Sequence, residues 1–158
     1  MYHAFPPLYA AHPRILILGT FPSPLSREKG EYYGNPKNQF WRIIFDAFNL
    51  PFEKPAYDAK KKALFQNGVA LWDVIKSCEI EGALDTAIRN PVYNIELPAF
   101  IEANKIPVVL FNGGNAYTFY KRGIGNIENR ILPSTSPANA RLRYEEKLRL
   151  WSEALTRI

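Results

Sequence analysis

The chain has 158 residues, of which 47% are hydrophobic, 14% aromatic and 22% charged. This composition predicts one folded domain over residues 1–158 and excludes a disordered chain, and no apolar run approaches the roughly 20 residues of a membrane-spanning helix. The formal net charge of +5 and the aromatic content favour nucleic acid as a partner. A single cysteine, Cys78, excludes an internal disulfide and fits a reducing cytoplasm.

The first thirteen residues are predicted to lie over the surface as an arm, and they lack the pattern of a signal peptide. Because His3 and His12 are far from any cysteine or acidic cluster, no metal site is expected there. Residues 14–18 form a buried apolar strand, and residues 19–41 follow as a long loop rich in Gly, Pro, Ser, Tyr and Asn. Since ligands bind at the carboxyl ends of strands in open α/β sheets, this loop predicts a pocket.

The rest of the chain alternates between helix and strand. Apolar residues at helical spacing predict helices over residues 38–48 and 57–65, and further helices near residues 97–104 and 117–120. Apolar runs predict strands over residues 69–74, 108–111 and 129–132, with a loop after residue 74. A closing helix is predicted after Ser136, a good N-cap, with Pro137 at its first position. This alternation predicts a three-layer α/β/α sandwich with a central four-stranded parallel sheet.

The loops that follow the four predicted strands should gather along one edge of the sheet. That edge would bring together polar and aromatic side chains from distant parts of the chain: Tyr33, Asn38, Asp73, Asn112 and Ser134. The pattern therefore predicts one composite site, although it does not name the ligand.

Four short segments carry a resemblance to a known family: GTFPS at residues 19–23, NPKNQFW at 35–41, FNGGNAY at 111–117 and LPSTSPAN at 132–139. Together, and in this order, they resemble the uracil-DNA glycosylase superfamily, in particular its hypoxanthine-DNA (deoxyinosine) glycosylase branch. The resemblance spans nearly the whole chain and implies the fold of that superfamily. It also implies a monofunctional DNA glycosylase that flips a deaminated base out of DNA and hydrolyses its N-glycosidic bond, leaving an abasic site. The implied base is hypoxanthine.

One departure from the family concerns the group that activates water. Relatives place an Asp or Asn at the position of Phe21 and a His or Asn at that of Leu132, and neither side chain present here can do that work. The resemblance to the hypoxanthine branch implies that Asn38 is the relocated catalytic group, which holds a water by its side-chain carbonyl. The alternative is that Asn38 only caps the helix that begins near Phe40.

Contacts to the flipped base are expected from Phe21, Tyr33, Asp73 and Asn112. Tyr33 has the spacing of the stacking aromatic of relatives, or it is an ordinary loop tyrosine. Asp73 would accept the N1–H of hypoxanthine, or donate to O6 if burial keeps it protonated; the alternative is a helix cap or an Arg partner. Asn112 would touch the base or sugar, or only shape the turn that follows it.

Contacts to the DNA strand are expected from a second group: Ser23, Ser134, Ser136, Pro137, Ala138, Asn139 and Arg141. The hydroxyls and the amino terminus of the closing helix would bind phosphates, and the apolar pair Pro137 and Ala138 would fill the emptied base stack. The alternative is a well-capped helix with basic residues in a solvated first turn.

Two other functions stay open on the sequence alone. One is a glycosylase of the same chemistry for uracil or xanthine, and the other is a non-catalytic lesion-sensing or DNA-binding module of the same fold. The expected partner is DNA that contains deaminated bases, with no membrane, metal or cofactor. The protein is expected to be a monomer in the cytoplasm, associated with the nucleoid.

Overall fold

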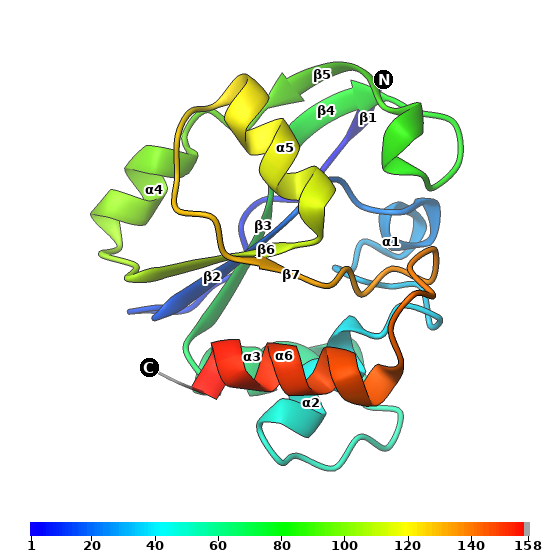
Figure 1. Ribbon diagram of the computed structural model, residues 1–158, viewed down its shortest axis with the longest axis vertical. Coiled ribbons are helices and arrows are strands. Elements are labelled where there is room, and N and C mark those ends of the chain that lie inside the picture. Colours follow the sequence, from blue (N-terminus) through cyan, green and yellow to red (C-terminus); the bar gives the residue numbers. More distant parts are fainter. Residues whose placement is uncertain (157–158) are drawn as a thin grey trace.

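The centre of the molecule is a four-stranded parallel sheet, shown in Figure 1 for the computed structural model, which describes residues 1–156. Its strands lie in the order β3 (Val69–Asp73), β2 (Ile15–Gly19), β6 (Val108–Asn112) and β7 (Ile131–Leu132). The register pairs Gly19 with Asp73 and Asn112 with Leu132, so the carboxyl ends of the strands meet at one edge. The predicted central sheet is confirmed.

Helices cover both faces of this sheet (Figure 1). Because side chains alternate across a strand, Ile15 and Ile17 of β2 pack on one face, and Leu16 and Leu18 pack on the other. The first face is covered by α2 (Phe40–Ala47), α3 (Tyr57–Gln66) and α6 (Tyr144–Thr156), and the second by α4 (Leu97–Ala103) and α5 (Gly114–Gly123). The predicted three-layer α/β/α sandwich is therefore confirmed. Among the described helices, none has both the length and the apolar composition to cross a bilayer.

A three-stranded antiparallel sheet, which the sequence did not predict, lies beside the central one. It is formed by β1 (Tyr2–His3), β4 (Ile75–Glu79) and β5 (Arg89–Tyr93), with β4 in the middle. The prediction of a loop after residue 74 is wrong, because the backbone leaves β3 and enters β4 at once. Ile75 and Cys78 of β4 are fully buried in a small core of their own, whereas Lys76 is exposed.

The predicted loop over residues 19–41 contains a short helix, α1 (Pro24–Lys29). Ser23 caps this helix, because its Oγ accepts the N–H of Ser26 at 3.3 Å, and Pro24 takes the first helical position. Gly30 ends the helix in the left-handed conformation, with φ of 69°. A shorter helical turn, η1 (Asp85–Ala87), lies in the connection between β4 and β5.

The closing helix begins at Tyr144, not at Pro137. Ser136 does not cap it: the Ser136 Oγ accepts the N–H of Ala138 at 3.2 Å, and the Ser136 carbonyl accepts the N–H of Asn139 at 3.0 Å. These bonds close a local turn, so residues 133–143 form a loop. The predicted N-cap role of Ser136 and the helical position of Pro137 are therefore wrong.

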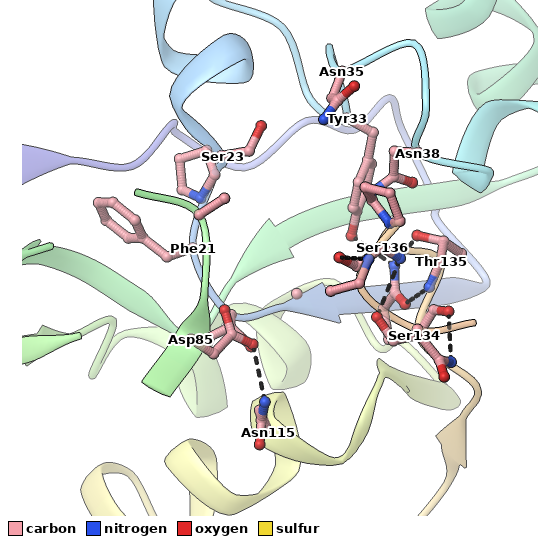
Figure 2. A pocket seen from close by; sticks show the side chains of 18 of the residues that line it. Phe21, Ser23, Tyr33, Asn35, Asn38, Asp85, Asn115, Ser134, Thr135 and Ser136 are labelled. Atoms are coloured by element: carbon pink, nitrogen blue, oxygen red, sulfur yellow. Dashed lines mark hydrogen bonds between the residues drawn. The ribbon is translucent and has the colours of Figure 1, made fainter. Parts of the chain in front are cut away.

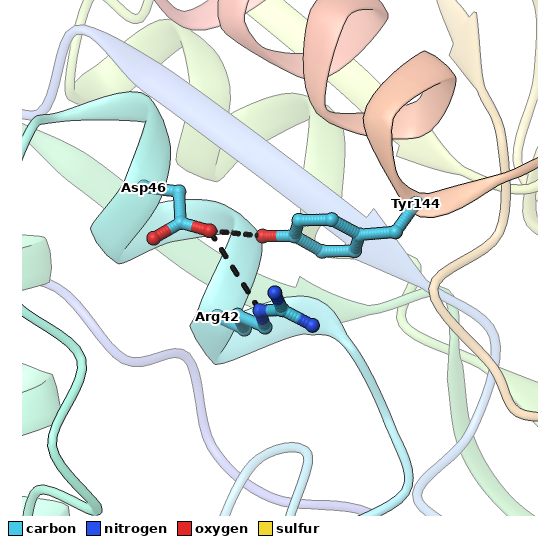
Figure 3. A network of polar contacts seen from close by, with 3 residues as sticks. All are labelled: Arg42, Asp46 and Tyr144. Atoms are coloured by element: carbon cyan, nitrogen blue, oxygen red, sulfur yellow. Dashed lines mark hydrogen bonds and ion pairs between the residues drawn. The ribbon is translucent and has the colours of Figure 1, made fainter.

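Packing against α2 holds the amino-terminal end of α6 in place (Figure 3). The Tyr144 hydroxyl donates to Asp46 Oδ2 at 2.5 Å, and the guanidinium of Arg42 lies 4.0 Å from the centre of the Tyr144 ring. Farther along α6, Trp151 and Leu155 are fully buried in the core on this side of the sheet. The helix that follows the loop is thus anchored to the one that follows Asn38.

Candidate active site

A pocket of about 360 Å³ opens at the carboxyl ends of β2, β3 and β6 (Figure 2). This volume is within the range of small-ligand sites. All the site residues predicted from the sequence line it: Phe21, Ser23, Tyr33, Asn38, Asp73, Asn112, Ser134, Ser136, Pro137, Ala138, Asn139 and Arg141. The fold therefore brings together residues that are up to 120 positions apart in the chain.

Tyr33 forms an aromatic wall of the pocket. Its ring stacks on that of Phe40, with centroids 4.1 Å apart and an angle of 23° between the planes. The backbone of Tyr33 is in the left-handed region, at φ of 53°, which is uncommon for a residue with a side chain. Burial raises the pKa of the Tyr33 hydroxyl, so the ring stays neutral. A rigid neutral ring is a surface on which a planar ligand can stack.

Asn112, at the end of β6, links this wall to the loop 133–143. The Asn112 Nδ2 donates to the Tyr33 hydroxyl at 3.2 Å and to Thr135 Oγ1 at 3.0 Å, and the Asn112 Oδ1 accepts the N–H of Thr135 at 3.0 Å. Both amide hydrogens are therefore in use, and one lone pair of Oδ1 is left for a ligand. Thr135, which is 1% exposed, was not predicted as a site residue.

Gly113, which follows Asn112, has its backbone in the left-handed region, at φ of 92°. Ser134 occupies the space into which a side chain at this position would point. A side chain at this position would be strained by the backbone and would meet Ser134 at 3.1 Å. The glycine therefore allows the loop 133–143 to approach the end of β6.

Asp73 is the most unusual group of the site. It ends β3, is 4% exposed, and its Oδ2 is buried without a hydrogen-bond partner. Burial, and to a lesser extent the carboxylate of Asp85, raise the pKa of Asp73 to about 7. In the described part of the chain Asp73 has neither the Arg partner nor the helix-capping bond that its alternative interpretation requires.

Asp85 is a second carboxyl of the pocket, and sequence reasoning did not single it out. It comes from η1, and its Oδ2 accepts a hydrogen bond from Asn115 Nδ2 at 3.3 Å (Figure 2). Burial raises the pKa of Asp85, while hydrogen bonds from Asn115 and Thr20 act in the opposite direction. Its position follows from the connection between β4 and β5, which no local pattern indicated.

Asn38 lies between the pocket and the start of α2. Its Oδ1 accepts the N–H of Phe40 at 2.9 Å in a local turn directly before the helix, whose N-cap position is Gln39, and its side chain lines the pocket. One lone pair of Oδ1 and both hydrogens of Nδ2 are left for a ligand or a water.

Phe21 lines the pocket near its rim, on the wall opposite Asn38 (Figure 2). Its ring also packs against the small core under β4, and the guanidinium of Arg27 lies 5.5 Å from the ring centre. These contacts fix an apolar side chain where relatives of the resembled family would place a polar one.

The loop 133–143 forms another wall and presents two exposed apolar side chains, Pro137 and Ala138, at its turn. Within the loop, the Ser134 Oγ accepts the N–H of Ser136 at 3.2 Å, and the Asn139 Nδ2 donates to the Ser134 carbonyl at 3.1 Å. The expected phosphate site at a helix amino terminus is wrong here, because α6 begins at Tyr144. The loop itself carries the polar groups.

Lys147 of α6 joins this loop to the segment of Asn38. It is 2% exposed, and its Nζ donates to the carbonyl of Asn139 at 2.7 Å and to Gln39 Oε1 at 3.0 Å. The backbone N–H of Gln39 in turn donates to the Thr135 carbonyl at 3.0 Å. A buried lysine thus holds two walls of the pocket together, and sequence patterns gave no sign of it.

Lys147→Met keeps the apolar stem and removes these two hydrogen bonds. Because two partly buried acceptors lose their partner, the free energy of unfolding is expected to fall by about 1–3 kcal/mol. Urea unfolding of the variant beside Lys62→Met, the same change at an exposed lysine of α3, measures this loss. Equal stability of the two variants would show that Lys147 does not hold the pocket walls.

Comparisons with known proteins identify the family of the chain. The family model described as "Uracil DNA glycosylase superfamily" matches residues 6–156. A protein from Methanosarcina acetivorans named Hypoxanthine DNA glycosylase is 39% identical over 139 residues, 87% of each chain. A protein of the same name from Methanosarcina barkeri is 36% identical over 155 residues, 97% of each chain. A solution NMR structure from M. acetivorans, provisionally named a uracil DNA glycosylase, has 34% identity and a TM-score of 0.77, covering 98% of this chain and 96% of its own.

Proposed function

This chain belongs to the Uracil DNA glycosylase superfamily, and from that membership we propose that it is a monofunctional DNA glycosylase. It flips a deaminated base, hypoxanthine, out of DNA and hydrolyses the N-glycosidic bond, leaving an abasic site. The two relatives named Hypoxanthine DNA glycosylase support this base. The observation that carries the proposal is the pocket itself, with a stacking wall on one side and an unpartnered buried carboxyl at its floor.

The base is held by stacking and by contacts to its pairing edge, as in other enzymes that flip bases. The face of Tyr33 turned away from Phe40 stacks on hypoxanthine. Asp73, with a pKa of about 7, meets the pairing edge: its protonated form donates to O6, and its ionised form accepts N1–H. Asn112 and Phe21 complete the lining around the base.

Bond cleavage leads toward a cationic, oxocarbenium-like sugar and an anionic base, so electrostatic stabilisation and water placement do most of the work. Asn38 holds the attacking water with the free lone pair of Oδ1. An amide can orient a water but cannot take a proton from it.

Duplex DNA is bound along the rim of the pocket. Pro137 and Ala138 are exposed and apolar, as suits side chains that fill an emptied base stack. The polar groups Ser23, Ser134, Ser136, Asn139 and Arg141 line the same rim and contact the phosphates. We further propose that the chain acts as one domain and as a monomer, in the cytoplasm at the nucleoid.

The test is single-turnover release of the base from duplexes that carry one deoxyinosine, uracil or xanthine. Asn38→Ala is expected to slow release of hypoxanthine by about 100-fold while the affinity for DNA stays unchanged. Loss of the hydrogen bond from the Phe40 N–H would give a slow variant for a trivial reason, because that bond shapes the start of α2. Asn38→Ser controls for this, because serine can accept the same N–H but is too short to reach the water.

Three outcomes would contradict parts of this proposal. Full activity of Asn38→Ser would show that Asn38 acts only through its bond to the Phe40 N–H. Release of uracil alone by the wild type would make the assigned base wrong. DNA binding without release of any base would point to a non-catalytic lesion-binding module.

A further inference from the structure

The proposed reaction needs a group that takes a proton from water, and Asn38 cannot do so. Five of the side chains that line the pocket can gain or lose a proton: Tyr32, Tyr33, Asp73, Asp85 and Arg141. Burial raises the pKa of both tyrosines, so they are neutral and poor acceptors, and Arg141 keeps its proton. The two aspartates are therefore the acceptors that this lining offers.

Their positions separate the two carboxyls. Asp73 is at the floor, 4% exposed, where Gly19 and Tyr33 close around it. A flipped nucleotide enters base first, so the floor meets the base, and the sugar stays near the rim. Asp85 is only half-buried and comes from η1, next to the exposed residues 81–84. It is therefore nearer the opening of the pocket, where the sugar of a flipped nucleotide would remain.

We propose that Asp85 is a catalytic residue of this glycosylase, the general base that takes the proton of the attacking water. This role rests on the proposed function. In the step, the C1′–N9 bond breaks and its electron pair leaves with the base. The water oxygen bonds to C1′, one water proton passes to the Asp85 carboxylate, and that proton then returns to the purine, so that neutral hypoxanthine and an abasic sugar are formed.

The contacts of Asp85 suit this role. Asn115 Nδ2 donates to Oδ2 at 3.3 Å, so a neutral donor orients the group. Within residues 1–156 no Lys or Arg forms an ion pair with it, so its negative charge is not cancelled. An uncancelled charge also stabilises the cationic sugar of the transition state.

Negative charge at this rim weakens the attraction of DNA phosphates. A carboxylate at this position therefore does not help to bind DNA, but it can take part in the chemical step. The same group should therefore affect binding and rate in opposite directions.

Asp85→Asn tests this, because the amide keeps the shape and an acceptor for Asn115 but cannot take a proton. Single-turnover release of hypoxanthine is expected to fall by about 100-fold or more, with equal or tighter affinity for a duplex carrying a non-cleavable deoxyinosine analogue. Asp58→Asn, the same change at an exposed residue of α3, is the matched control.

Two further readouts separate a catalytic from a merely structural role. Formate added to Asp85→Ala supplies a free carboxylate and is expected to restore part of the rate. The wild-type rate should decline at low pH, as the proton acceptor becomes protonated, and Asp85→Asn should lack this decline. The groups around Asp85 in this measurement are Thr20, Asn115 and the carboxyl of Asp73, so Asp73→Asn is measured in parallel.

The outcomes are distinguishable. Wild-type release of hypoxanthine with an equally fast Asp85→Asn overturns the role of Asp85 and leaves the proposed function intact. Loss of the low-pH decline in Asp73→Asn, but not in Asp85→Asn, also overturns it. A wild type that releases no hypoxanthine overturns the proposed function, and the role of Asp85 with it.

Discussion

The effect of Asp73→Asn on the free energy of unfolding is expected to depend on pH. It should be about 4 kcal/mol more favourable at pH 8 than at pH 4. The cause is the raised pKa of Asp73, about 7 in the fold against 3.8 for an unperturbed carboxyl. Between these values the native state binds more protons than the unfolded state, so the wild type loses stability as the pH rises. The loss is complete above pH 7, and a neutral amide does not suffer it.

Urea unfolding of wild type and variant at several pH values between 4 and 8 measures this difference. Asp58→Asn, whose side chain is 96% exposed, is the control for removing an aspartate charge. A difference between wild type and Asp73→Asn that does not change with pH would show that the carboxyl is paired or solvated in solution.

The raised pKa of Asp73 also bears on function. A neutral amide at position 73 would avoid the loss of stability that ionisation causes as the pH rises, yet the chain carries an unpartnered carboxyl there. Groups that cost stability persist where they serve a site. Asp73→Asn should therefore also change the relative rates at which the enzyme releases hypoxanthine and uracil, because an amide presents a donor and an acceptor at every pH.

The central sheet could be predicted because its strands are short apolar runs that end in polar or glycine residues. Residues 15–18 and 108–111 show this pattern, and burial on both faces leaves no polar alternation to confuse it. The same strand ends also identified the edge at which the site forms. That is why Asp73 and Asn112 could be singled out before their neighbours were known.

The antiparallel sheet could not be predicted in this way. Buried and exposed residues do not alternate strictly along its middle strand, β4, because Ser77 and Cys78 are both buried. The register between β4 and β5 also shifts twice. No period of two is therefore visible around Lys76 and Glu79. Since Asp85 reaches the pocket only through the connection that this sheet creates, it was missed together with the sheet.

The loop 133–143 was misread for a different reason. Ser136 followed by Pro137 is a good local signal for the start of a helix. Tertiary contacts override it: Asn112 holds Thr135, and Lys147 holds the carbonyl of Asn139. A sequence shows neither partner, because both come from other elements.

Gly19→Ala is expected to abolish most of the release of hypoxanthine. A β-carbon at this position would lie 2.6 Å from Asp73 Oδ1, closer than such atoms can approach, and 3.0 Å from the Tyr33 hydroxyl, a tight contact. Neither neighbour can easily withdraw, because Tyr33 is stacked on Phe40 and Asp73 is enclosed at the floor. Overpacking of this kind costs about 1–3 kcal/mol of stability, and a displacement near 1 Å at a reacting site can slow the reaction about 100-fold.

The matched control for this change is Gly114→Ala in the first turn of α5, where a β-carbon would meet no atom within 4 Å. That variant should keep its activity and its stability. Single-turnover rates and urea unfolding of both variants separate a local clash from a general effect of losing a glycine. If Gly19→Ala released hypoxanthine at the wild-type rate, Asp73 and Tyr33 could not be the groups that hold the base, since this substitution must displace at least one of them.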